Sequence, residues 1–201
     1  EVVGALGQPL LGGLNVSLPG LPLTLSAQFT DPGRADHQSA LVGWGDGWID
    51  ANFDVFSDAF GGALGVLQQV HVYAAPADYT VQLELVDDDG GATLATVGVE
   101  VLSAEDALWR VADALAAQIA TAGPAAPHLQ AAWAHLVGQA GGQAINGALD
   151  KLAAGKPGVA ITHMILALEA IAAAQAASGI DLSAHADLIG LTAEHLARAA
   201  L

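Results

Sequence analysis

The spacing of apolar residues changes once along this chain of 201 residues, close to Leu102, and this change limits the fold more than any other feature. Before Leu102, apolar and polar residues alternate in the stretches LTLSAQF, YTVQLELV and ATVGVEV. In the second stretch one face holds Tyr79, Val81, Leu83 and Leu85. A period of two is typical of half-buried strands. We therefore predict an all-β domain over residues 1–102, a sandwich of about seven short strands.

After Leu102 the period becomes helical. Ser103 followed by Asp106 is typical of a capped helix start. The apolar stripe that follows it consists of Leu108, Val111, Leu115 and Ile119. Further helical stretches, separated by glycines and prolines, begin near Pro127, Ile145, Pro157 and Ser183. We expect Ser183 to cap the last helix, and we predict a compact bundle of about five helices over residues 103–201.

The chain is strongly acidic, with 21 Asp and Glu against 5 Lys and Arg and a formal net charge of -16. This balance argues against nucleic acid and anionic membrane surfaces as partners, because both require a basic surface. The absence of cysteine excludes disulfides and thiolate chemistry. The N-terminal arm, from Val2 to Leu25, carries no charge. It contains too many prolines and glycines for a membrane-spanning helix, so we predict no membrane insertion.

Two stretches of the first half carry a specific combination of motifs. They are FTDPGRADHQSALVGWGDG, from Phe29, and VHVYAAPADYTVQLELVDDDGG, from Val70. In this order, over residues of about 14–102, they resemble a PKD (polycystic kidney disease) domain, although Gly43 stands where that family often has Asp. The resemblance implies an Ig-like β-sandwich whose structural motif residues are Asp31, Gly33, Trp44, Asp46, Gly47, Tyr73, Tyr79 and Gly90.

Three of these motif residues have a physical role that the sequence suggests. Trp44 ends an alternating strand and is expected to point into the core. Asp46, between two glycines, suits a tight turn in which its carboxylate accepts from backbone N–H groups. Tyr79 opens a strand, and its hydroxyl is expected to reach a nearby backbone carbonyl.

The second half has a resemblance of its own. The segments LDKL and ADLI, with a Gly-Lys break after the first, are similar to the helical FIMAH-type module. That module follows other modules in secreted bacterial proteins. The resemblance covers residues of about 103–201.

PKD-like domains are usually non-catalytic extracellular modules, and the sequence contains no Cys, no G-x-S-x-G and no H-E-x-x-H. We therefore expect a non-enzyme: an extracellular interaction or adhesion module of an exported bacterial surface or secreted protein. Its partner would be a protein or a glycan. One alternative is a structural subunit of an extracellular polymer or multi-protein complex, which would self-associate. A more distant alternative is an accessory domain pair of a secreted hydrolase.

A calcium site is the sharpest chemical hypothesis. Asp87, Asp88 and Asp89 supply oxygen ligands, to which Asp46 could add another. The alternative is a solvated acidic hairpin around Gly90, and no other cofactor is expected.

The stretch WIDANFDVFSDAF alternates aromatic and acidic residues, and we expect it to form a strand followed by a loop. We propose its aromatic residues as a partner-binding patch, namely Trp48, Phe53, Phe56 and Phe60. The alternative is that they pack against the helical half. The apolar N-terminal arm could pair with a sheet edge of a neighbouring copy.

Overall fold

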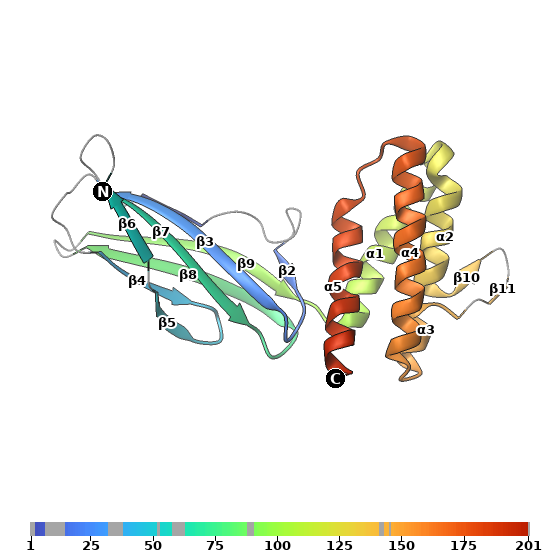
Figure 1. Cartoon of the computed structure of the whole chain (residues 1–201), viewed down its shortest axis with the longest axis horizontal. Helices are drawn as coiled ribbons and strands as arrows, with labels where there is room; N and C mark the ends of the chain where they lie inside the picture. The colour runs from blue at the N-terminus through green and yellow to red at the C-terminus, as the bar shows by residue number, and fades with distance from the viewer. Residues whose placement is uncertain are drawn as a thin grey trace. The chain divides into compact units, whose positions relative to one another are not determined.

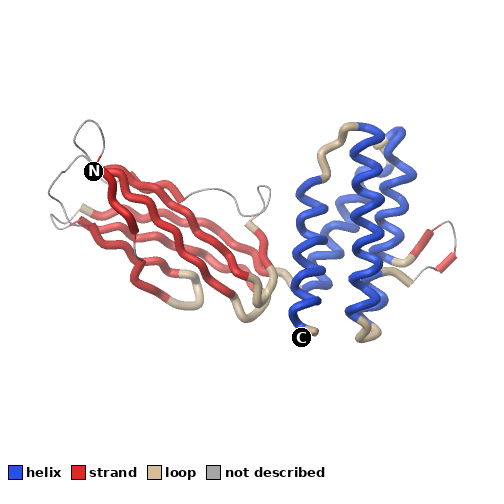
Figure 2. The backbone as a smooth tube through the Cα atoms, viewed as in Figure 1, coloured by secondary structure: helices blue, strands red, loops and turns tan. Residues whose placement is uncertain are grey.

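A computed structural model describes residues 3–6, 15–31, 38–51, 53–57, 63–87, 91–140, 143–144 and 146–200. The chain divides into two compact units, Glu1–Val101 and Leu102–Leu201. Figure 2 shows long strands in the first unit, and helices with a short pair of strands in the second, which pair as a sheet of two. The N-terminal half is therefore rich in strands, and the C-terminal half carries five α-helices.

The strands of the first unit form two sheets (Figure 1). The four-stranded sheet has the order β1 (Val3–Leu6), β3 (Pro22–Asp31), β7 (Ala63–Val72) and β6 (Phe53–Ser57). The five-stranded sheet has the order β2 (Val16–Ser17), β9 (Ala92–Val101), β8 (Ala77–Asp87), β4 (Gln38–Gly43) and β5 (Trp48–Ala51). Neighbouring strands are antiparallel except β2 and β9, which are parallel.

Side chains from both sheets contribute to one buried cluster. The four-stranded sheet and the loop after it supply Leu23, Leu25, Ala27, Phe29, Leu67 and Tyr73. The five-stranded sheet and its flanking residues supply Ala40, Val42, Trp44, Val81, Leu83, Leu85, Val99 and Val101. The predicted alternation of β8 is confirmed, because Val81, Leu83 and Leu85 are buried while Gln82 and Glu84 are partly exposed.

The residues predicted to form a hairpin turn around Gly90 lie between β8 and β9, which pair antiparallel. The pairing of β8 and β9 runs from Ala77 opposite Val101 to Val86 opposite Ala92. Asp88, Asp89 and Gly90 lie outside the described residues, as does Gly33. The stretch after Trp48 differs from the expectation, because β6 is a second strand where a loop was expected.

The helices of the second unit are α1 (Ala104–Ile119), α2 (Ala126–Val137), α3 (Ala148–Ala153), α4 (Pro157–Ser178) and α5 (Ser183–Ala199). A 3-10 turn, η1 (Gly123–Ala125), and the short strands β10 (Gln139–Ala140) and β11 (Gln143–Ala144) complete it. The predicted cap of α1 is confirmed, because Ser103 Oγ accepts from the backbone N–H of Asp106 at 3.1 Å. The predicted cap of α5 is wrong: Ser183 is its first residue, and its N–H donates to Asp181 Oδ1 at 2.9 Å.

Helix α4 contacts α2, α3 and α5, as Figure 1 shows for the labelled helices of this unit. It is also long and apolar enough to cross a membrane by length and composition alone, with a mean hydropathy of 1.6 in its apolar window. A core helix of a soluble protein meets the same criterion. The absence of membrane insertion therefore stays a prediction.

Candidate binding surface

The turn between β4 and β5 is built on a glycine. The backbone N–H of Trp44 donates to the carbonyl of Gly47 at 2.7 Å, which closes the turn. Gly45 has a φ of 88°, and a Cβ there would lie 3.2 Å from the backbone nitrogen of Thr80. Both facts favour glycine at this position. The turn brings Trp48 back beside Gly43, its cross-strand partner.

The Trp44 side chain lies inside the first unit, with 1% of its surface exposed. Its ring stacks on His71 at a centroid distance of 4.7 Å. His71 Nε2 lies 3.0 Å from Asp46 Oδ2, so the imidazole donates to the carboxylate. The partner of Asp46 is thus a ring nitrogen, where backbone N–H groups were expected. These residues hold the turn against β7, which is a structural task.

Two tyrosines complete this cluster. Tyr73 OH donates to the carbonyl of Trp44 at 2.9 Å, and Tyr79 OH donates to the carbonyl of Ala75 at 3.0 Å. Their rings stack at 4.0 Å. Burial raises the pKa of Tyr73 above its ordinary value, and the charges of Asp46 and Tyr79 raise it further. The Tyr73 hydroxyl therefore stays protonated and keeps its donor role at neutral pH.

The structure does not bring the predicted calcium ligands together as a set. Asp46 follows one end of β4, whereas Asp87 pairs with Gln38 at the other end. β4 is six residues long, so its two ends lie about 17 Å apart. The Asp87 side chain, Asp88 and Asp89 lie outside the description. In the part of the chain that the structure describes, no group of three or more Asp, Glu or His could hold a metal ion. Calcium binding remains a prediction.

Trp48, the first predicted partner-binding residue, opens the edge strand β5 and is 57% exposed. A Cβ built on Gly43 would meet the six-membered ring of its indole at 2.9 Å. The ring therefore lies on the backbone of Gly43, and a side chain at position 43 would clash with it. One side of the indole rests on the sheet while more than half of the residue faces solvent.

The residues around Trp48 follow from the strand register. Gly43 pairs with both Trp48 and Gln82, and Leu41 pairs with both Asp50 and Glu84. Glu84 in turn pairs with Leu94. Residues directly opposite in antiparallel strands share a face. We call this outward surface of the five-stranded sheet the Trp48 face: Leu41, Trp48, Asp50, Gln82, Glu84 and Leu94.

Two shallow grooves meet at Trp48. One, of about 360 Å³, is lined by Gly43, Gly45, Gly47, Trp48, Asp78, Tyr79, Thr80 and Gln82. The other, of about 250 Å³, is lined by Trp48, Gln82, Glu84, Ala92, Thr93 and Leu94. Trp48 and Gln82 line both. A ligand bound across the Trp48 ring would therefore contact a groove lined by polar residues on each side of it.

The other predicted partner-binding residues are placed differently. Phe53 and Phe56 lie in β6, which pairs with β7 in the four-stranded sheet, whereas Trp48 lies in the five-stranded sheet. The side chains of Phe53 and Phe56 are outside the description, as is Phe60. The structure thus places Trp48 in a different sheet from the two phenylalanine positions.

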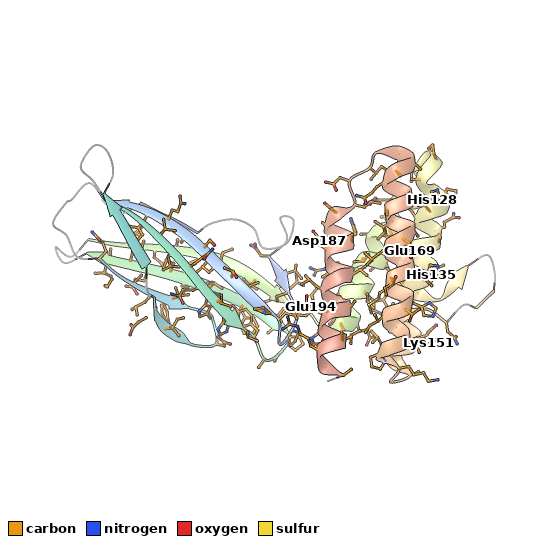
Figure 3. All side chains as sticks on the ribbon, in the orientation of Figure 1. His128, His135, Lys151, Glu169, Asp187 and Glu194 are labelled. Carbon is orange, nitrogen blue, oxygen red and sulfur yellow. The ribbon has the colours of Figure 1, made fainter. Side chains whose placement is uncertain are left out.

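Two histidines of the second unit are brought together, and a third, His185, is also partly buried. The rings of His135 on α2 and His163 on α4 lie 6.0 Å apart. Burial lowers the pKa of His163, and His135 and Lys151 lower it further; Figure 3 labels these two neighbours. Burial also lowers the pKa of His185, against the opposing effect of Asp181. The lowered pKa values favour the neutral form of the His163 and His185 imidazoles at pH 7.

Sequence reasoning missed two parts of the candidate site. It did not pair His71 with Asp46, because 25 residues separate them and only the sheet packing brings them together. It noted Gly43 as a departure from the PKD pattern without assigning it a contact. The signal was present: GWGDGW places Gly43 and Trp48 symmetrically about a tight turn, so they must face each other.

No family model and no curated protein matches this chain. Among solved structures, it is similar to the PKD domain of an M14-like peptidase from a Thermoplasmatales archaeon, with 18% identity. This match covers 51% of the chain and 92% of that domain, at a TM-score of 0.31. It is also similar to the BIgI domain of the beta protein from S. agalactiae, which was solved bound to CEACAM1. That match has 8% identity, covers 50% and 96% of the two chains, and has a TM-score of 0.31. Neither likeness, at this TM-score, shows the family or the function of the chain.

Proposed function

We propose that this chain is a non-enzymatic, extracellular interaction module that binds its partner through the Trp48 face. In this proposal the first unit is a PKD-like, Ig-like sandwich and the protein is exported. The observation that carries the proposal is Trp48 itself. It is 57% exposed, lies on a glycine of the sheet between two grooves, and shares its face with the exposed Leu41 and Leu94; an exposed apolar patch with polar residues around it is typical of an interaction site.

The physical argument rests on what a flat indole offers. Tryptophan contributes a large contact area with little loss of conformational entropy, and it is enriched among the residues that dominate binding energy. The Gly43 contact limits the rotation of the Trp48 ring before any ligand arrives. A surface ordered in advance loses less entropy on binding. Leu41 and Leu94, 37% and 61% exposed, extend the apolar area.

The chemistry of the described residues favours binding over catalysis. The hydrogen-bonded pair of His71 and Asp46 is the first place to look for acid–base catalysis. His71 is stacked on Trp44, and Asp46 belongs to the turn, so both side chains are engaged in holding the hairpin. The Trp48 face itself contributes carboxylates, an amide and apolar groups, which suit recognition.

The experiment compares Trp48→Ala with a matched control, Trp109→Ala. Trp109 lies on α1 and is 42% exposed, so its removal changes a similar amount of surface elsewhere. Both variants and the unaltered chain are applied to panels of immobilised polysaccharides and of peptides. We expect a ligand whose binding falls at least about tenfold in Trp48→Ala and not in Trp109→Ala. Ligands that bind Trp48→Ala as well as the unaltered chain would contradict the proposal.

A second candidate function is supported by a different observation. Helix α4 exposes Val159, Ile165 and Leu166, at 45%, 50% and 37%. Val159 and Leu166 are seven residues apart and lie along one side of the helix, while Ile165 lies about 100° around the helix from Leu166. Such an exposed apolar surface suits a subunit of an extracellular assembly, in which copies bury it against one another. Sedimentation velocity over a hundredfold concentration range, with and without Ca²⁺, tests this candidate. Self-association that Ile165→Asp abolishes would favour it, and a monomer throughout would remove it.

A further inference from the structure

The Trp48 face is acidic as well as aromatic. Asp50 and Glu84 stand on either side of Leu41, in the row of residues next to Trp48 and Gln82. Asp78 lines the first groove. No Lys or Arg occurs between residues 38 and 102, so no basic residue of these strands balances these carboxylates. Residues 1–102 as a whole contain 13 acidic residues and one basic residue, Arg34.

An exposed indole next to carboxylates has a defined chemical preference. A cation over the face of an aromatic ring is attracted by the ring quadrupole, most strongly for tryptophan, and arginine is the side chain that most often uses it. The guanidinium is planar, so it stacks on the ring while its N–H groups remain free for a carboxylate. Lysine offers a compact charge that cannot do both equally well.

We infer that the Trp48 face binds an arginine-bearing segment of a basic partner protein, with a guanidinium stacked on Trp48 and paired with Glu84 or Asp50. This rests on the proposed function and adds the chemistry of the partner. Asp50 is two residues from Trp48 along β5, about 7 Å away, and Glu84 lines the same groove as Trp48, so both carboxylates are within reach of a group that covers the indole. The second groove, lined by Trp48, Glu84 and Leu94, accommodates the aliphatic part of the arginine side chain.

Charge decides between this partner and a carbohydrate. An anionic polysaccharide would be repelled by Asp50, Asp78 and Glu84. A neutral oligosaccharide would use the indole and Gln82 but would gain nothing from the negative field of the unit. A basic segment gains from both, because complementary charge speeds association and orients the bound segment.

The experiment follows the indole N–H signal of Trp48 in ¹H–¹⁵N NMR spectra of the full chain, identified by its absence in Trp48→Ala. The probes are an uncharged-end peptide with three arginines spaced by glycine, the same peptide with three lysines, and a neutral glucose hexasaccharide. We expect the arginine peptide to shift the Trp48 signal saturably and to bind more tightly than the lysine peptide. We expect Trp48→Ala to weaken the arginine peptide roughly threefold to thirtyfold.

Charge-matched variants separate a specific site from general attraction. Trp48→Ala leaves the net charge at -16, so diffuse attraction of a cationic peptide would be unchanged in it. Glu84→Gln is compared with Glu105→Gln, which removes the same charge from α1 in the other unit. We expect Glu84→Gln to weaken the arginine peptide several-fold more than Glu105→Gln, and added salt to weaken it in the unaltered chain.

Two outcomes would overturn the inference of an arginine site, and they have different consequences for the proposed function. If Trp48→Ala binds the arginine peptide as the unaltered chain does, the attraction is diffuse and no arginine site exists. If the hexasaccharide shifts the Trp48 signal and the arginine peptide does not, the partner chemistry is wrong while binding through this face stands. The proposed function itself fails only if the ligand panels also yield nothing that depends on Trp48.

Discussion

The two units of this protein bury their apolar residues in different ways. The largest fully buried side chains of the strand-rich unit include Trp44, Tyr73 and Phe29. In the helical unit many fully buried residues are alanines, namely Ala107, Ala112, Ala125, Ala132, Ala148, Ala160, Ala167 and Ala174. Large rings join leucines and valines in the first core, whereas many small side chains let neighbouring helices approach closely in the second.

The difference predicts opposite weaknesses. A core that depends on large rings is most sensitive to truncation, because truncation leaves a cavity. A core that depends on alanine is most sensitive to enlargement, because the helices have no space for extra atoms. The aromatic core also needs hydrogen-bond partners for its polar atoms, such as the bond from Tyr73 to the carbonyl of Trp44.

The largest effect is expected for Trp44→Ala. The side chain is 1% exposed and contacts His71 and Tyr73, so its loss removes the centre of the aromatic cluster. We expect a loss of about 3 to 5 kcal/mol in the free energy of unfolding of the strand-rich unit. Urea titration with hydrogen exchange of β4 and β8 peptides measures it. A loss below about 1 kcal/mol would show that the ring does not hold this core.

Enlargement of the alanine core comes next. Ala167 on α4 is fully buried, so Ala167→Leu is expected to cost the helical unit about 1 to 3 kcal/mol. The control is Ala172→Leu, on the exposed side of the same helix, which is expected to be near neutral. Circular dichroism at 222 nm during urea unfolding measures both. Equal effects of the two variants would remove the argument from close helix packing.

An effect of comparable size is expected for Tyr73→Phe. The change removes the donor to the Trp44 carbonyl and leaves that buried acceptor without this bond, which costs about 1 to 3 kcal/mol. Tyr79→Phe is the matched change, because its bond to Ala75 is exposed and water replaces it. We expect Tyr79→Phe to cost less than Tyr73→Phe. The reverse order would indicate that the exposed bond is the one that holds the turn.

The two units should also respond to pH in opposite directions. The pKa of His163 is lowered by burial, His135 and Lys151, so the neutral form is favoured in the folded state. Its contribution is present above the unfolded value of about 6.5 and is lost as the pH falls below it. The pKa of Tyr73 is raised by burial, so its contribution is present below about 10 and is lost as the pH rises above it.

We therefore expect acid to lower the stability of the helical unit through His163, and strong alkali to lower that of the strand-rich unit through Tyr73. The effect of acid should be the smallest of the four predicted effects on stability, because His163 is only partly buried and solvent screens its charge. Thermal melts at pH 7 and pH 5, followed at 222 nm, measure it. In His163→Gln the loss of stability at pH 5 should shrink, and an unchanged loss would assign it to other groups.

Much of the secondary structure was readable from local pattern. The alternation in YTVQLELV predicted which residues of β8 are buried, and the change of period near Leu102 predicted strands before it and five helices after it. These features depend on neighbours two to four residues apart, which the sequence displays directly. The Ser103 cap belongs to the same class, whereas Ser183 was misread because Asp181, two residues earlier, accepts from its backbone.

The candidate site was only partly readable. The sequence named Trp48 as a candidate partner-binding residue together with Phe53 and Phe56, but the structure places it in a different sheet from them, since the chain changes sheets after β5. Sequence spacing along a single stretch does not say at which residue a chain crosses from one sheet to the other. That depends on which strands pair, and pairing is a long-range property.

By itself, the sequence determined the two kinds of secondary structure, the place where one replaces the other, and the acidity of the first 102 residues. The tertiary structure alone decided that His71 meets Asp46 and that Asp46 and Asp87 stand at opposite ends of β4. It also placed Trp48 over Gly43, between grooves lined by residues of β8 and β9. The physical reason is that period and charge are local sums along the chain, whereas a binding surface is assembled by strand register across it.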